Sequence, residues 1–155
     1  MEVRETKMGS GVRFVLPASL DCICRVDEAL GRVVLARGWD VDAFAVRILL
    51  HEALMNAIVH GSGGDPEREV VVTVSEVAEG LTLVVEDSGE GFALERLRAP
   101  VDVLADGGRG IPLMRIYADE VRHNERGNVV TLFRRFESLR GSSEPAGAAS
   151  PGAYR

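Results

Sequence analysis

The chain has 155 residues, of which 46% are hydrophobic and 27% charged, and this composition fits one domain with a single core. Its formal net charge of −6 argues against direct binding to nucleic acid, because a general grip on phosphates needs a basic face. We expect no membrane span, because no apolar run looks long enough, and the polar N-terminus lacks a signal region. A cytoplasmic location is therefore expected.

The first elements in chain order are a strand and a helix. Residues 11–17 alternate as a strand that stops at a proline. Ser19 suits the N-cap of a following helix, whose apolar residues recur at helical spacing. Gly38 is typical of its C-cap.

The second predicted helix carries an acid and an amide on one face. It begins at Asp40 or Asp42 and ends at Gly61, and Glu52 and Asn56 lie four residues apart within it. The apolar positions of this helix include Val41, Phe44, Ile48, Met55 and Val59. Because apolar residues flank the acid and the amide along their face, we expect that face to point inward. A solvated polar pair at a helix edge is the alternative interpretation.

Two strands at 69–77 and 81–87 follow as a predicted hairpin. Asp87 shares the parity of the apolar residues in the second strand, so its carboxylate should point toward the buried layer. Two interpretations stay open, since Asp87 either meets a ligand amino group or caps the following turn. Gly89 and Gly91 come directly after this strand and would let a ligand approach the backbone closely.

The remaining chain combines glycine-rich loops with short elements. Residues 93–106 have mixed polarity and predict a lid. The cluster 106–110 precedes a helix at 111–119, and this pattern fits either a phosphate cradle or simple turns. Two closing strands follow, in which Thr131 is a site candidate or an ordinary strand residue. Residues 137–155 are assigned to a flexible C-terminal tail because small and polar residues dominate them.

The grouping of elements predicts the fold class. Helices beside largely antiparallel strands favour an α+β fold, a two-layer α/β sandwich with helices on one face. The sheet is expected to be mixed but mostly antiparallel.

Three motifs together resemble the GHKL ATPase superfamily. "HEALMNAIVHG" (51–61) resembles its N-box, "DSGEGF" (87–92) its first glycine box and "GGRGIPLM" (107–114) its second. Within the superfamily, the chain looks most like the small bacterial anti-sigma-factor serine/threonine-protein kinases. The match covers residues 11–136, which are assigned to one ATP-binding kinase domain.

This resemblance implies the Bergerat ATP-binding fold, with ATP and Mg²⁺ as cofactors. Glu52 would be the catalytic base and Asn56 the Mg²⁺ ligand. Asp87 would accept the adenine amino group, with Thr131 nearby. The other nucleotide-binding positions would be Gly89, Gly91, Gly108, Arg109 and Gly110. Pro112 stands where many relatives have glycine, and it removes one backbone N–H from the phosphate side.

The resemblance also implies a function and partners. Such a protein binds a sigma factor and phosphorylates a serine of an antagonist protein, and a homodimer is suggested. Two alternatives stay open: a non-catalytic GHKL module that binds nucleotide and a partner, and a detached histidine-kinase catalytic domain.

Overall fold

The computed structural model describes residues 2–90 and 110–141. Within these residues a six-stranded sheet has the order β1-β2-β3-β4-β6-β5, and every neighbouring pair is antiparallel. The strands are β1 Arg4–Met8, β2 Gly11–Pro17, β3 Glu69–Val77, β4 Gly80–Asp87, β5 Glu120–His123 and β6 Val129–Arg135. The described sheet is thus wholly antiparallel, not mixed as predicted.

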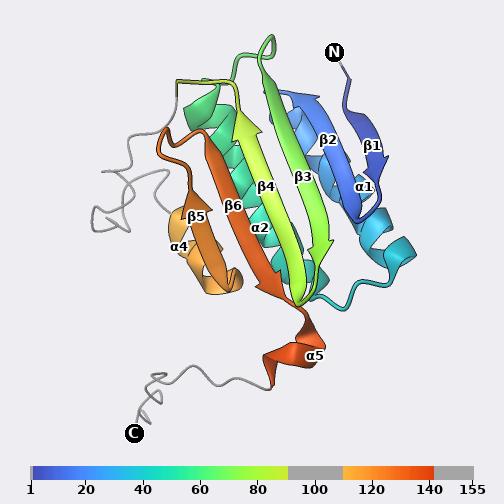
Figure 1. The fold of residues 1–155 in the computed structure, drawn as a ribbon. Helices are drawn as coiled ribbons and strands as arrows, with labels where there is room; N and C mark the ends of the chain where they lie inside the picture. The colour runs from blue at the N-terminus through green and yellow to red at the C-terminus, as the bar shows by residue number, and fades with distance from the viewer. Residues whose placement is uncertain (1, 91–109, 142–155) are drawn as a thin grey trace, which may run out of the picture.

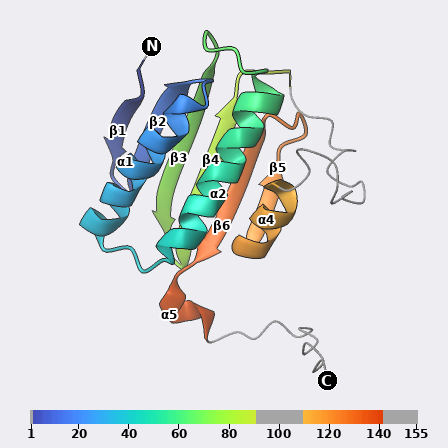
Figure 2. The same ribbon diagram turned by 180° about the vertical axis from the view of Figure 1, so that it is seen from behind.

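Three helices cover one face of this sheet, as Figures 1 and 2 show from opposite sides. They are α1 Asp21–Arg37, α2 Ala43–Met55 and α4 Gly110–Tyr117. A fourth, short helix, α5 Glu137–Arg140, lies beyond the end of the sheet. The predicted α+β two-layer sandwich is confirmed.

Strand alternation builds the core between the two layers. One set of side chains on the four central strands faces the helices, and all of them are buried. The set comprises Val12, Phe14, Leu16, Val70, Val72, Val74, Leu81, Leu83, Val85, Val130 and Leu132. Each fully buried aliphatic or aromatic side chain of this kind contributes roughly 1.5–3 kcal/mol.

Strand β1 was not predicted from the sequence. Its five residues are all exposed, so no alternation of apolar and polar residues marks it. It is held by backbone pairing with β2 and by an ion pair of 2.6 Å between Arg4 and Glu69. The prediction for Ser19 was also wrong, because α1 begins at Asp21 without a side-chain cap. The C-cap is confirmed, since Gly38 has a φ of 63°.

Helix α2 is capped by Asp42, whose carboxylate accepts hydrogen bonds from the backbone N–H groups of Phe44 and Ala45. Two of the apolar residues noted in this helix lie outside the core, because Phe44 is 59% exposed and Val59 40%. The buried residues of α2 and the turn after it are Ala45, Val46, Leu49, Leu50, Ala53, Leu54, Ala57 and Ile58. This arc is broad because α2 packs on the sheet and also against α1 and α4.

The stretch Ala43–Gly61 is long and apolar enough, by length and composition alone, to cross a membrane. This finding differs from the expectation that no such run exists. The core helix of a soluble protein passes the same test, and the buried arc of α2 packs into the core of this domain. The stretch is therefore weak support for a membrane span.

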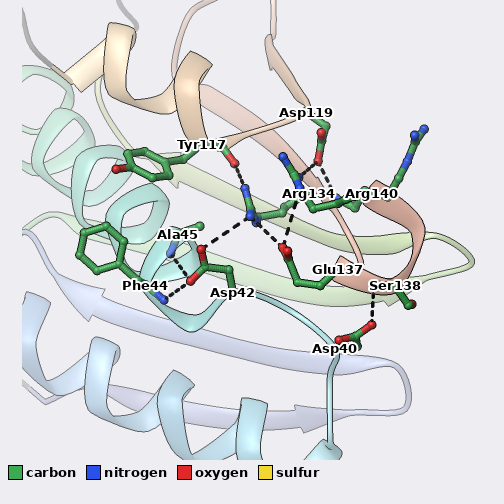
Figure 3. Close-up of polar contacts among 11 residues, drawn as sticks. Asp40, Asp42, Phe44, Ala45, Tyr117, Asp119, Arg134, Glu137, Ser138 and Arg140 are labelled. Atoms are coloured by element: carbon green, nitrogen blue, oxygen red, sulfur yellow. Dashed lines mark hydrogen bonds and ion pairs between the residues drawn. The ribbon is translucent and has the colours of Figure 1, made fainter. Parts of the chain in front are cut away.

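Arg134 is the centre of a polar cluster that joins three helices (Figure 3). Its side chain is buried and donates to the backbone carbonyl of Tyr117 at the end of α4, at 2.5 Å. It also donates to Glu137 of α5 at 2.8 Å and lies 3.9 Å from the Asp42 carboxylate that caps α2. The guanidinium thus fixes the start of α2, the end of α4 and the start of α5 relative to one another.

The first residues of the predicted tail are part of the folded domain. Asp40 accepts a hydrogen bond from the Ser138 N–H through its side chain, and one from the Glu137 N–H through its carbonyl. This contact lowers the pKa of Asp40. At the other side of α5, Arg140 donates to Asp119 at 2.8 Å. The rest of the predicted tail lies outside the described residues.

Glu137→Gln tests the polar cluster. The substitution keeps the size of the side chain but removes the anion that meets the buried Arg134 guanidinium. We expect a loss of about 1 kcal/mol in the free energy of unfolding, measured by urea denaturation. Glu120→Gln is the matched control, because it breaks an equally short but exposed pair with Arg122 and should cost less than about 0.5 kcal/mol. Equal effects of the two substitutions would contradict a role for Glu137 in holding Arg134.

Candidate functional site

Asp87 ends strand β4 on the face covered by the helices. It is directly opposite Val70 in the register of β3 and β4, and it is 7% exposed. The parity prediction for Asp87 is therefore confirmed. A carboxylate at such a position is costly unless hydrogen-bond donors meet it.

One oxygen of Asp87 caps the turn that follows β4. Its Oδ1 accepts a hydrogen bond of 2.9 Å from the backbone N–H of Gly89. The turn-capping interpretation is thus correct. A hydrogen bond to one oxygen leaves room in principle for a second donor at the other, so the two interpretations of Asp87 are compatible.

Two glycines form a cradle around the Asp87 carboxylate. A Cβ on Gly61 would overlap the carboxylate itself, and a Cβ on Gly89 would overlap both the carboxylate and the carbonyl oxygen of Gly61. Only glycine fits at these two positions with the present backbone. Sequence reasoning treated Gly61 merely as a helix end and so missed its contact with Asp87.

Gly61 reaches Asp87 through a π-helical turn. Helix α2 continues as η1, Asn56–Gly61, in which the N–H of Ser62 bonds to the carbonyl of Ala57 at 2.8 Å. Such wide turns are frequent at functional sites. Asn56 opens the same turn that Gly61 closes, which links the amide of the N-box to the Asp87 cradle. The Ser62 hydroxyl is buried and has no hydrogen-bond partner among the described residues.

Burial raises the pKa of the Asp87 carboxyl above its ordinary value of 3.8. Loss of solvation is the main cause, and the neighbouring carboxylate of Glu86 adds to it. The hydrogen bond from Gly89 and the positive charges of Arg126 and Arg68 act in the opposite direction. The ionised carboxylate of Asp87 is therefore stabilised against burial by the Gly89 N–H and by the charges of Arg126 and Arg68.

Thr131 does not join Asp87. It is opposite Val84 in the register of β4 and β6, and Val84 points away from the face that carries Asp87. The same register continues to Asn128, whose backbone carbonyl accepts the Asp87 N–H at 3.0 Å and whose amide donates to the Asp87 carbonyl at 3.1 Å. Asn128, rather than Thr131, is thus the residue of this hairpin that contacts Asp87. The role of Thr131 came from the resemblance alone, and the position of this residue along its strand does not by itself fix its pairing with β4.

Glu52 and Asn56 flank the buried arc of α2 instead of pointing into it. Both are partly buried, and the Glu52 side chain is 19% exposed. Its carboxylate lies 3.6 Å from Nδ1 of His51, which is exposed. The two side chains thus point partly inward, at the edge of the core and not within it. An intermediate position at the edge of the core is nevertheless suited to lining a ligand site.

The remaining predicted site residues belong mostly to other parts of the chain. Gly91, Gly108, Arg109 and the predicted lid lie outside the described residues. Gly110 is the first residue of α4, and α4 packs against α2. The predicted helix with Pro112 in its first turn is therefore confirmed.

Comparison of the sequence with known protein families shows the class to which this chain belongs. Residues 15–134 match the profile of the histidine kinase-like ATPase domain, so the chain belongs to this family, as its motifs predicted. The α+β fold agrees with this assignment.

Among named relatives, the serine-protein kinase RsbW of Bacillus subtilis is 24% identical over 135 residues, covering 81% of this chain and 84% of that protein. RsbW of Bacillus licheniformis is 26% identical over 130 residues, covering 77% and 81%. The anti-sigma F factor of Bacillus cytotoxicus is 33% identical over 81 residues, covering 49% and 56%. The predicted resemblance to the anti-sigma-factor kinases is confirmed at the level of sequence similarity.

Asp87→Asn should stabilise the protein without ligand at neutral pH. A raised pKa means that the folded state binds the proton of Asp87 more tightly than the unfolded state does. The favourable contribution of the protonated group is complete well below pH 3.8 and is lost as the pH rises through the folded pKa. We therefore expect the variant to be more stable than the wild type in urea at about pH 7, with a smaller advantage at about pH 3. Lower stability of the variant at pH 7 would contradict this electrostatic account.

Gly61→Ala should destabilise the domain, because the new methyl group overlaps the Asp87 carboxylate. The expected loss in unfolding free energy is about 1–3 kcal/mol, the usual cost of overpacking. Gly31→Ala is the control, since a Cβ at that position in α1 meets no atom within 4 Å and alanine favours helix. A Gly61→Ala protein as stable as Gly31→Ala would show that the cradle is not tightly packed.

Proposed function

We propose that this chain is an ATP-dependent serine/threonine-protein kinase of the anti-sigma type, which binds a sigma factor and phosphorylates a serine of its antagonist. The observation that carries the proposal is the buried Asp87 carboxylate in its cradle of Gly61 and Gly89. The membership of the histidine kinase-like ATPase family supports nucleotide binding. The names of the relatives support the kinase and anti-sigma roles.

At the adenine end, Asp87 would accept a hydrogen bond from the amino group of the base. Its Oδ1 is held by the Gly89 N–H, and this fixes the orientation of the carboxylate. The absence of side chains at Gly61 and Gly89 lets the carboxylate pack against the backbone, which would hold it in place for the base. Guanine would place a carbonyl oxygen opposite the carboxylate, so the site favours adenine.

At the phosphate end, Asn56 and Glu52 are the residues assigned to the chemistry. ATP bound with Mg²⁺ would supply the phosphoryl group to be transferred. The amide oxygen of Asn56 is a hard ligand of the kind that Mg²⁺ prefers. Among the described residues, no cluster of three or more His, Cys, Asp or Glu is placed to hold a metal ion, so nucleotide oxygens would complete the coordination. Glu52 would accept the proton of the attacking serine hydroxyl.

The proposed partners follow from the relatives. A sigma factor and an antagonist protein are the expected protein partners, and a homodimer and a cytoplasmic location are part of the same proposal. Direct contact with nucleic acid or membrane is not part of it. A nucleotide-binding module without phosphoryl transfer is the alternative, because the partly exposed Glu52 could also be a solvated helix residue.

Glu52→Gln distinguishes the kinase from the binding module. The amide keeps size and hydrogen bonding but cannot accept a proton, so phosphoryl transfer should fall about 10²–10⁴-fold. ATP affinity should stay close to the wild-type value, because the adenine contacts lie on Asp87 and the glycines. The measurement is single-turnover transfer from labelled ATP to an antagonist captured from the native host. Glu28→Gln on α1 is a control for the loss of one exposed acid.

Transfer by Glu52→Gln at the wild-type rate would exclude the catalytic role. If the wild type transfers phosphate to no captured partner while still binding ATP, the binding-module interpretation replaces the kinase.

Asn56→Ala tests the metal assignment. Without the amide oxygen, ATP should bind with little dependence on Mg²⁺, whereas the wild type should bind ATP more tightly when Mg²⁺ is present. Calorimetric titrations with and without Mg²⁺ measure this difference. If the variant retains the full wild-type enhancement, another group holds the metal.

A further inference from the structure

We propose that Arg126, in the turn between β5 and β6, is a positioning residue for the adenine end of the site. It holds the backbone that follows Asp87 and thereby fixes the orientation of the carboxylate. This inference rests on the proposed function, because the group that it positions is the one assigned to adenine.

The Arg126 guanidinium spans two successive carbonyls of the loop after β4. Its NH2 group lies 3.4 Å from the carbonyl oxygen of Gly89, and its Nε lies 3.4 Å from that of Glu90. Both are long hydrogen bonds, so each is weak by itself. The fork of an arginine can nevertheless hold two acceptors at once, which a lysine cannot do with the same geometry.

The turn that carries Arg126 is well braced. The side-chain oxygen of Asn124 accepts the N–H groups of Asn128 and Val129, both at 3.1 Å. The N–H of Gly127 bonds to the Asn124 carbonyl at 3.0 Å, and the φ of Gly127 is 75°, a value that favours glycine. The base of the Arg126 side chain is thus fixed on the hairpin.

The same hairpin also holds the backbone of Asp87. Asn128 accepts the Asp87 N–H at 3.0 Å and donates its amide to the Asp87 carbonyl at 3.1 Å. Asn128 therefore fixes the residue that carries the carboxylate, while Arg126 holds the two carbonyls just beyond it. Oδ1 of Asp87 accepts from the N–H of Gly89, and Arg126 holds the carbonyl of the same residue, so movement of Gly89 would turn the carboxylate.

Arg126 also affects the charge state of Asp87. Its positive charge lowers the pKa of this carboxyl and so opposes the effect of burial, and Arg68 before β3 acts in the same way. Other charged or titratable groups on the surrounding elements are Glu86 of β4, Glu90 of the loop, Glu125 of the turn and His60 of η1. Because burial and the charge of Glu86 disfavour the ionised carboxylate, removal of one of the two arginines should matter most at low pH.

Arg126→Ala should therefore weaken binding of both adenosine and ATP by the same factor, roughly 3- to 10-fold at pH 7. The loss should grow as the pH falls to about 5, since more of Asp87 is then protonated in the variant. Arg126→Lys should return the pH dependence of binding to that of the wild type but should recover only part of the affinity. Lysine returns the positive charge but cannot hold two carbonyls as the guanidinium does. Arg122→Ala is the control, because this exposed arginine of β5 pairs with Glu120 and lies on the other face of the sheet.

Unchanged adenosine affinity in Arg126→Ala would overturn the proposal. A loss for ATP but not for adenosine would overturn it too, because Arg126 would then be a phosphate contact. A second measurement needs no nucleotide, namely the NMR titration of the Asp87 carboxyl carbon, whose midpoint should be higher in Arg126→Ala than in Arg122→Ala. Failure of the wild type to bind either ligand would refute the proposed function, whereas an unchanged Asp87 midpoint in Arg126→Ala would overturn the role of Arg126 without any nucleotide.

Discussion

The close packing of the Asp87 carboxylate against the backbone of Gly61 and Gly89 is the constraint on which the site depends. It requires a strand that ends with an acid on its buried face, and a helix long enough to bring a glycine to that acid. Helix α2 meets the second requirement through its π-helical end, η1. Its other end is fixed by the Asp42 cap beside the buried Arg134. Figure 1 shows α5, which shares that cluster, at the opposite end of the sheet from the end of β4.

The two ends of the domain thus use buried charge in different ways. At the α5 end, Arg134 meets a carbonyl and two carboxylates, so its charge is compensated within the fold, although its buried Nε has no hydrogen-bond partner among the described residues. At the other end, Asp87 receives one backbone N–H and a raised pKa, so its charge is only partly compensated. An imperfectly satisfied group costs stability, and such groups are common where a ligand completes the set of partners. The difference in charge compensation, rather than in hydrogen bonding, is the physical reason to place the ligand at Asp87 and not at Arg134.

Much of this architecture could be predicted from the sequence because local patterns encode it. Alternation marked β3 and β4, glycine marked the end of α1, and parity put Asp87 on the buried face. Strand β1 left no such pattern, since all its residues are exposed. The roles of Gly61, Asn128 and Arg126 depend on which strand residue pairs with which, and on a turn that departs from α-helical geometry. Neither can be read from spacing along one chain, and the role that the resemblance gave to Thr131 likewise depended on strand pairing.

The central claim is that Asp87 recognises the amino group of adenine. The most direct measurement is a calorimetric comparison of ATP with inosine triphosphate, which carries a carbonyl oxygen where adenine has its amino group, on the wild type and on Asp87→Asn. The account predicts that the wild type binds ATP at least about 10-fold more tightly, a difference of about 1.4 kcal/mol. It also predicts that Asp87→Asn loses most of this preference. Equal affinity of the wild-type protein for the two nucleotides would contradict the account.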